Sequence, residues 1–255
     1  IASFGLISII GVADPNSVKP MTQIIVLATA LVFVPEYFRR SSLVWPLGLL
    51  LAGGGLIGAW FGSSLSSAYL SDMKTFRPLF GALTLVIAAQ IAWKLYSSQS
   101  KQSAGPSSEE RADSQGVHDL SISRMALSFS YGGKDFRVLL WSPFLAGFLI
   151  ATIAAIFGVG GGFLLVPYMS SLLRMPMHII PATSGIAIIV SLLVSIGNYL
   201  ALGSQLETDS LVPMLVGAVL GAMIGPFINR WMKNSRLQMV LSFIIFAIGL
   251  RYVVA

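Results

Sequence analysis

Eight apolar runs, four on each side of a polar middle, limit the folds that this chain can adopt. Several of them approach the ~20 apolar residues that a helix needs to cross a bilayer, and they lack the alternating pattern of a barrel strand. The chain is 55% hydrophobic and 10% charged, whereas a soluble domain carries roughly 25% charged residues. The sequence therefore predicts an all-α, polytopic membrane protein. The runs lie at about 1–12, 21–38, 44–70, 77–96, 143–172, 179–202, 211–231 and 237–254.

The residue types in the chain argue against several classes of function. The formal net charge is +6, but the basic residues form short clusters at the ends of apolar runs, where cytoplasmic anchors are expected, so no nucleic-acid partner is predicted. The chain has no cysteine, and its two histidines, His118 and His178, lie far apart, so we expect no metal site and no cofactor. Neither G-x-S-x-G nor H-E-x-x-H occurs, so an enzyme is not expected.

The eight runs divide into two halves that repeat one another. The first membrane repeat spans residues 1–96, a polar linker covers 97–142, and the second membrane repeat spans 143–255. Each repeat contains a G-x-x-x-G-x-x-x-G triplet, at positions 54, 58 and 62 and again at 217, 221 and 225. Glycines four residues apart lie on one helix face, where a neighbouring helix can approach closely, so we expect the triplets to act in packing rather than in substrate binding.

The linker is rich in Ser, Gln, Gly and charged residues, a composition typical of an extramembrane segment. Its last part, residues 125–142, is expected to fold back as a turn or short hairpin around Gly132 and Gly133. It is too short to form a domain.

A single register aligns the two repeats. Setting Pro20 against Pro181 places Thr22 on Thr183 and Gln23 on Ser184, an offset of 161 positions. The same offset places residue 1 on Gly162, so a first-repeat counterpart of the second repeat's glycine cluster would lie just upstream of residue 1. We therefore expect the natural protein to extend upstream by at least a half-helix that ends in a glycine-rich turn.

Four glycines within five positions, in "GVGGGFLLVPY" (158–168), interrupt the apolar run at 143–172. As one helix this run would be about 45 Å long, too long for an upright crossing of a ~30 Å hydrocarbon core. Glycine destabilises a helix interior and adopts backbone conformations that other residues avoid. We expect a discontinuous helix or a re-entrant hairpin, a device with which carriers build sites near the bilayer midplane. The alternative is a kinked, tilted helix whose glycines only let a neighbour pack.

In these motifs the chain resembles the sulfite exporter TauE/SafE family, also called the 4-toluene sulfonate uptake permease family. The shared features are "GVGGGFLLVPYM" (158–169), "IPATSGIAI" (180–188), the two glycine triplets, and "FSYGGKDFRV" ahead of the second repeat. The resemblance covers nearly the whole chain. It implies a multi-pass carrier of small sulfur-containing anions, such as sulfite, sulfoacetate or related sulfonates, in the bacterial inner membrane. The first repeat reads "DPNSVKPMTQ" (14–23) where the second reads "MPMHIIPATS" (175–184), so sulfite itself is not implied.

The glycine break supplies the first group of candidate substrate-binding residues. An anion in a bilayer must replace its hydration shell with hydrogen-bond donors and positive potential, and the unpaired amides at a helix N-terminus offer both. The candidates at the break are Gly158, Gly160, Gly161 and Gly162.

Polar side chains near the start of the following helix, and of its counterpart in the first repeat, form the second group. Thr183 and Ser184 place hydroxyls one turn into that helix, and Thr22 and Gln23 are their register partners. A hydroxyl in a membrane helix also commonly bonds its own backbone.

Three further polar residues complete the candidate set. Asn16 and Lys19 precede the first-repeat helix, where Lys19 either binds the anion or extends to the membrane surface. Asn198, inside an apolar helix, either lines a pathway or bonds a neighbouring helix.

Charge favours inverted repeats, in which the glycine-containing run of each repeat enters and leaves on one face. One side then collects twelve basic residues: Arg39, Arg40, Lys94, Lys101, Arg111, Arg124, Lys134, Arg137, Arg174, Arg230, Lys233 and Arg236. The other side keeps four: Lys19, Lys74, Arg77 and Arg251. The positive-inside rule then predicts a cytoplasmic linker and an external C-terminus.

These features predict a secondary transporter, a monomer or homodimer, that works by alternating access with the anion held between two glycine breaks. No phosphate-binding loop of the Walker type occurs, so ATP is not expected as the direct energy source. A channel-like anion pore and a transporter of another small organic acid are the alternatives.

Overall fold

The structure, a computed structural model, describes residues 2–12, 14–39, 43–99, 118–122, 126–131, 134–173, 175, 179–229 and 234–254. Five of its helices are long and apolar enough to cross a membrane, and three shorter helices are also apolar. The prediction of an all-α, polytopic membrane protein is confirmed. The five spans are Pro15–Pro35, Trp45–Tyr69, Met73–Ala92, Ile180–Ala201 and Thr208–Gly225.

The elements follow the same order in the two repeats. The first repeat contains α1 (Ala2–Phe4), the π-helix η1 (Gly5–Ile10), α2 (Pro15–Arg39), α3 (Trp45–Tyr69) and α4 (Met73–Gln99). The second contains α5 (Trp141–Phe157), α6 (Gly162–Pro167), the π-helix η3 (Tyr168–Leu172), α7 (Ile179–Ala201), α8 (Thr208–Asn229) and α9 (Asn234–Val254). The 161-residue offset places α1 and η1 on α6 and η3, and each later helix on its counterpart.

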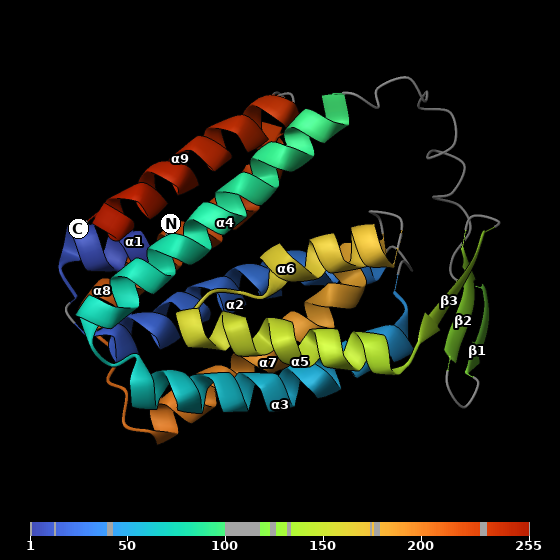
Figure 1. Cartoon of the computed structure of the whole chain (residues 1–255), viewed down its shortest axis with the longest axis horizontal. Coiled ribbons are helices and arrows are strands. Elements are labelled where there is room, and N and C mark those ends of the chain that lie inside the picture. Colours follow the sequence, from blue (N-terminus) through green and yellow to red (C-terminus); the bar gives the residue numbers. More distant parts are fainter. Residues whose placement is uncertain are drawn as a thin grey trace.

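The glycine-containing run of the second repeat is a broken helix that reverses its direction. The segment α5 ends at Phe157 and α6 begins at Gly162, so the predicted break is confirmed. The two helices run antiparallel, and the start of α5 lies at the same end of the molecule as the end of α6 (Figure 1). The run is therefore a helical hairpin, the shape expected of a re-entrant segment.

The glycine triplet of α3 is covered by α5. A Cβ atom added at Gly54, Gly58 or Gly62 would overlap the backbone of Phe144, Phe148 or Thr152, in that order. The two backbones lie so close that Thr152 Oγ1 donates a hydrogen bond to the Gly58 carbonyl at 3.2 Å. The packing role predicted for this triplet is confirmed.

The triplet of α8 has a different environment. A Cβ atom added at Gly217, Gly221 or Gly225 would meet no described atom within 4 Å. In this structure the second triplet therefore has no packing role among the described residues.

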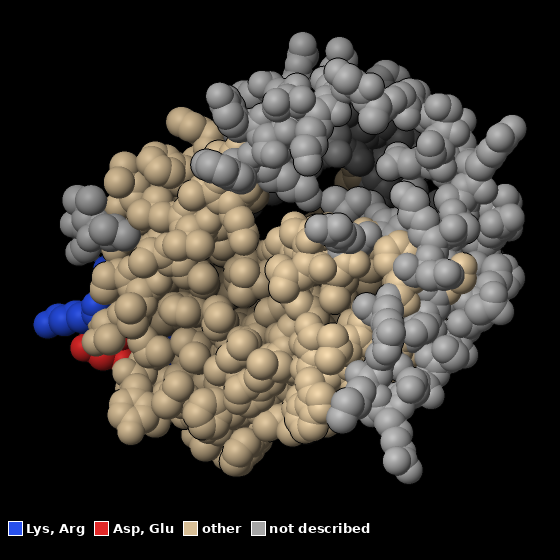
Figure 2. Space-filling model, turned by 45° about the vertical axis from the view of Figure 1, so that its right-hand side comes forward, with Lys and Arg blue, Asp and Glu red and all other residues tan. Residues whose placement is uncertain are grey.

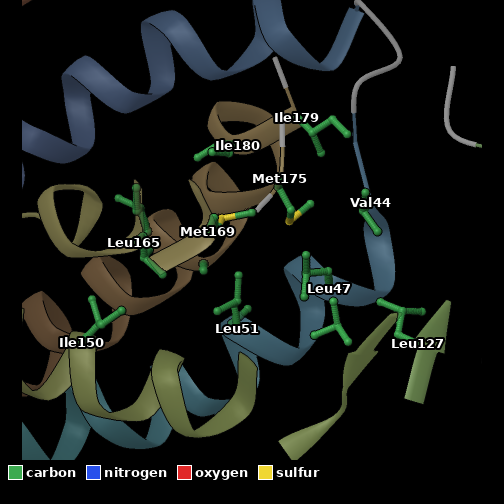
Figure 3. Close-up of a cluster of buried hydrophobic side chains, with 14 of the residues drawn as sticks. Val44, Leu47, Leu51, Leu127, Ile150, Leu165, Met169, Met175, Ile179 and Ile180 are labelled. Atoms are coloured by element: carbon green, nitrogen blue, oxygen red, sulfur yellow. The ribbon is translucent and has the colours of Figure 1, made fainter. Parts of the chain in front are cut away.

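Two apolar clusters hold the helices together. The larger joins α3, α5, α6, η3 and α7, and Figure 3 shows Leu165, Met169 and Ile180 converging with Leu47 and Leu51. The smaller joins η1, α2, α4, α8 and α9 around Leu6, Met21 and Phe76.

The linker contributes a three-stranded antiparallel sheet of β1 (His118–Ile122), β2 (Ala126–Tyr131) and β3 (Lys134–Leu139), in the order β1-β2-β3. Strands β2 and β3 pair from Ala126 with Leu139 to Tyr131 with Lys134, which confirms the hairpin predicted for 125–142. The strand β1 was not expected. Buried Leu127 points towards the start of α3 (Figure 3), so the sheet packs on the end of the helical body.

Large apolar side chains also cover the outside of the helices. Trp60 and Phe61 on α3 and Leu193 on α7 are about half exposed, as expected for residues that face lipid rather than water. In Figure 2, the described part of this face carries its charged side chains only at one edge.

Candidate functional site

The backbone turns sharply at the first glycine of the break. Gly158 has φ +69°, in the left-handed region, and the amides of Gly158 and Val159 donate back to the carbonyls of Ala155 and Ala154. A Cβ atom at position 158 would lie 2.6 Å from the Cα of Lys19. Both the conformation and the contact with α2 therefore require glycine here.

The other three glycines face different neighbours. A Cβ atom at Gly160 would lie 2.5 Å from Val26, whereas one at Gly162 would lie 3.3 Å from Ile188. At Gly161 it would make ordinary contacts with Ile150 and Ala154. Because a helix leaves its first amides unpaired, those of Gly161, Gly162 and Phe163 are donors that the break offers.

Gly161 also lines a small buried cavity between α2, α3, α5, α6 and α7. The space open to the centre of a water molecule inside this cavity is about 20 Å³. Since one water needs at least ~10–15 Å³ of such space, the cavity can hold a water molecule. The wall is mostly apolar, with three polar side chains. These are Gln23 on α2 and Ser191 and Ser195 on α7.

Two of these polar side chains have no partner. Gln23 and Ser195 are each 1% exposed. Within the described part of the chain, Gln23 Oε1 and Ser195 Oγ lack a hydrogen-bond partner, as does Arg77 Nε. An unsatisfied buried polar group costs about 1–3 kcal/mol. A pair of them lining one cavity therefore favours a polar occupant.

Lys19 lies one turn before Gln23 and is completely buried. Its ammonium donates to Leu70 O at 2.7 Å and to Asn16 Oδ1 at 3.2 Å, and lies 3.5 Å from Ser66 O. The ring of Phe76 lies below it at 5.1 Å. The lysine therefore caps the negative C-terminal end of α3.

The paired threonines and Ser184 lie outside the cavity wall. Thr22 donates to Val18 O at 2.9 Å and lies 3.3 Å from Ser3 Oγ, while Thr183 accepts from the amide of Val44 at 3.3 Å. Val44 precedes α3, so Thr183 helps to start that helix. Ser184 is buried on α7.

The two asparagines make structural contacts. Asn16 Oδ1 accepts a hydrogen bond from Lys19 Nζ, and the backbone N–H of Asn16 donates to Asp14 Oδ1 at 2.9 Å. Asn198 donates to Ser63 Oγ at 2.8 Å and Ser64 Oγ at 2.9 Å, so it ties α7 to α3. Of the residues that the sequence predicted, the structure brings Gln23 and Gly161 together in the cavity wall, and puts Lys19 beside Gly158.

Ser191 and Ser195 were missed by the sequence reasoning. A polar stripe on α7 could have identified them, because spacings of seven, four and three residues place its members on one face of the helix. Ser184, Ser191, Ser195 and Asn198 form this stripe.

This arrangement can hold a small polar ligand without any metal. Hydroxyl and amide groups can donate to the oxygens of an anion, and the buried ammonium of Lys19 adds positive potential one turn away. Among the described residues, no group of three or more His, Cys, Asp or Glu side chains could hold a metal ion.

Comparison with known proteins gives consistent results. A family model described as "Sulfite exporter TauE/SafE" matches residues 1–252. The chain is 25% identical over 228 residues to the "Probable membrane transporter protein YunE" of Bacillus subtilis (strain 168), covering 89% of this chain and 76% of that relative. It is 23% identical over 247 residues to a "Probable membrane transporter protein" of Xylella fastidiosa (strain Temecula1), covering 96% and 82%. No solved structure matches.

Proposed function

Because the chain belongs to the sulfite exporter TauE/SafE family and is a multi-pass membrane transporter, we propose that its cargo is a small sulfur-containing anion. It carries sulfite, sulfoacetate or a related sulfonate across the bacterial inner membrane as a secondary transporter, by alternating access. The cavity beside the glycine break is its substrate site.

The pair of unpartnered atoms in the cavity, Gln23 Oε1 and Ser195 Oγ, is the observation that carries this proposal. A polar ligand in the cavity would complete their hydrogen bonds. Gly161 brings the start of α6 to the same wall, where its free amides add donors for an anion. The ligand therefore meets an acceptor on α2 and donors on α7 and at the break.

The buried state of the site favours a carrier over a channel. A conducting pore needs a continuous polar path, whereas this cavity is walled by Leu51, Ile150, Leu165 and Leu192. Its small volume corresponds to an occluded conformation, and a sulfur oxyanion enters when the helices around it move apart. Val159 and Gly161, at the tip of the hairpin formed by α5 and α6, contribute to the wall.

Positive potential near the site offsets part of the cost of burying an anion. Lys19 contacts Gly158 through its backbone and precedes Gln23 by four residues, one turn of α2. Its three oxygen partners hold the ammonium at the end of α3, so Lys19 acts on the anion through space.

Flux measurements with purified protein in liposomes test the proposal. The panel contains sulfite, thiosulfate, sulfoacetate, sulfolactate and taurine, with a sulfur-free organic acid for comparison. We expect saturable uptake of at least one sulfur anion and no single-channel current in planar bilayers. Uptake of the organic acid alone would reject the substrate class, and single-channel currents would reject the carrier.

A bulky residue in the cavity wall tests the site. Gly161→Val places two methyl groups against the cavity, so flux should fall at least about tenfold while the protein still inserts and purifies. The matched control is Gly197→Val on α7, where an added Cβ meets no described atom. Equal flux in the two variants would reject the site.

A further inference from the structure

The unpartnered oxygen of Gln23 restricts the chemistry of the ligand. An amide oxygen only accepts hydrogen bonds, so its partner must be a donor. Gln23 is 1% exposed, and no described residue supplies a donor to Oε1. A fully deprotonated oxyanion offers only acceptors, and would bring its negative oxygens against this carbonyl. In this orientation of the amide, a ligand that completes the hydrogen bond carries its own O–H or N–H group.

The serines provide the complementary half of the site. Ser195 Oγ has no partner in the described part of the chain, and Ser191 lines the same wall one turn away. Each hydroxyl can donate to a ligand oxygen. A ligand with one donor and at least one anionic oxygen satisfies Gln23 and Ser195 together.

The charge near the cavity favours a ligand with one negative charge over a ligand with two. Lys19 is the one fully buried charged side chain among the described residues, and it precedes Gln23 by one turn of α2. Because Asp14 also interacts with this ammonium, Lys19 offsets at most part of a ligand's charge. Because the cost of desolvating an ion rises with the square of its charge, the dianion is strongly disfavoured.

Among the described residues, no titratable side chain lines the cavity: its wall from α2, α3, α5, α6 and α7 includes no Asp, Glu, His, Lys, Arg or Tyr. On the same helices, Lys19 caps α3 and Tyr199 donates to Ala155 O at 2.8 Å. Asp14, just before α2, lies close enough to Lys19 to interact with its charge. Asp209 on α8, which packs on α2, is exposed near the start of its helix.

From these contacts we infer that the cavity binds the singly charged, hydrogen-bearing form of a sulfur oxyanion, with Gln23 Oε1 accepting the ligand's hydrogen and Ser195 donating to an oxygen. This inference rests on the proposed function and specifies its cargo. The O–H bond of the ligand stays intact during transport. Each anion that crosses therefore carries one proton, and the protein needs no proton-relay residue.

Exchange of radiolabelled sulfite, with the same pH inside and outside the liposomes, tests the inference. Sulfite changes between a monoanion and a dianion at its second pKa, so the rate should follow the monoanion and fall about tenfold per pH unit above that pKa. Protein-free liposomes measure the passive leak of the neutral form, which is subtracted. Thiosulfate, a dianion at all these pH values, should exchange poorly throughout.

The variant Gln23→Met keeps the length of the side chain and removes the acceptor. Its sulfite exchange should fall about tenfold at every pH, because the monoanion is still the species exchanged, while the low thiosulfate exchange stays unchanged. A wild-type rate that follows the dianion, or a Gln23→Met variant that exchanges sulfite as fast as the wild type, would overturn the inference. If this variant does not fold, the pH profile of wild-type sulfite exchange and the comparison with thiosulfate still test the inference.

The same data separate the two proposals. A rate of sulfite exchange that does not depend on the monoanion fraction overturns this inference but does not affect the proposed function. Absence of exchange for every sulfur anion in the panel overturns the proposed function, and the inference falls with it.

Discussion

Gly158 combines two constraints that are separate elsewhere in the chain. Its φ of +69° lies in the left-handed region. A Cβ atom at this position would lie 2.6 Å from the Cα of Lys19, so the missing side chain leaves room for that residue. Gly203, after α7, has φ +88° but open space around it. A comparison of the two positions therefore separates backbone strain from the helix contact.

Gly158→Ala should destabilise the protein much more than Gly203→Ala. The left-handed conformation costs an alanine about 1–2 kcal/mol at either position. The collision with Lys19 adds about 1–3 kcal/mol at position 158 alone. Thermal unfolding in detergent should show the larger fall in Tm for Gly158→Ala, and equal shifts would mean that α2 does not press on the break.

Tyr199→Phe tests the hydrogen bond that holds the end of α5. The hydroxyl of Tyr199 is buried and donates to Ala155 O at 2.8 Å, three residues before the break. Its removal should cost about 1 kcal/mol, and thermal unfolding measures the effect. The control is Tyr69→Phe, because Tyr69 is 76% exposed. No difference between the two variants would contradict the role of this bond.

The sequence predicted only part of the site at this scale. Gln23 and Gly161 were found because a repeat register and a glycine cluster are visible in the letters. Ser195 was not, since its role depends on which face of α7 meets the small residues Ala151 and Ala154 of α5 across the cavity. That meeting is a tertiary property, which the sequence of one helix does not reveal.

At the level of elements, the two glycine triplets have opposite surroundings despite the same spacing. The α3 triplet lies against the backbone of α5, and α8 presents its triplet to no described atom. The spacing of glycines predicts a face that can pack closely, but not whether a helix covers it.

Gly58→Ala should disrupt the helical body, and Gly221→Ala should not. A Cβ atom at position 58 overlaps the Phe148 backbone, so α3 and α5 must separate along their whole contact. At position 221 the added methyl group meets open space. Size-exclusion profiles of the detergent-extracted variants should show loss of folded protein for Gly58→Ala alone. Equal losses would mean that an additional helix packs on α8.

Helix boundaries show what a search for apolar runs misses. The apolar run that began at 21 belongs to a helix that begins at Pro15, and this first turn is polar. Asp14 stabilises that turn by accepting hydrogen bonds from the amide of Asn16 and the hydroxyl of Ser17. The turn was not predicted because hydropathy carries no capping signal. Conversely, the break at 158–162 was predictable because four glycines disfavour a continuous helix even within an apolar run.

At the scale of the whole molecule, the reversal of chain direction at the glycine break determines which loops lie at the same end of the molecule. The sheet of the linker lies at one end of the helical body, and the turns that follow α3 and α7 lie at the other end (Figure 1). The described strand β3 of this sheet carries Lys134 and Arg137. The positive-inside rule thus predicts that the sheet is cytoplasmic.

Single cysteines test this orientation directly, since the chain has none of its own. A cysteine at Gln205, which is exposed after α7, should react with a membrane-impermeant maleimide added to intact cells. A cysteine at Lys134, which begins β3, should react only after the inner membrane is opened. The reverse pattern would show that the linker is external.

The contact between α3 and α5 also has a consequence for biosynthesis. Gly58 and Thr152, which are hydrogen bonded, lie 94 residues apart in the chain. At about 5–20 residues per second, α3 enters the membrane roughly 5–20 s before its partner helix is made. During this interval its glycine groove faces lipid or the insertion machinery. The first repeat thus completes its packing only after the ribosome has translated the linker and α5, which makes the order of synthesis part of the folding mechanism.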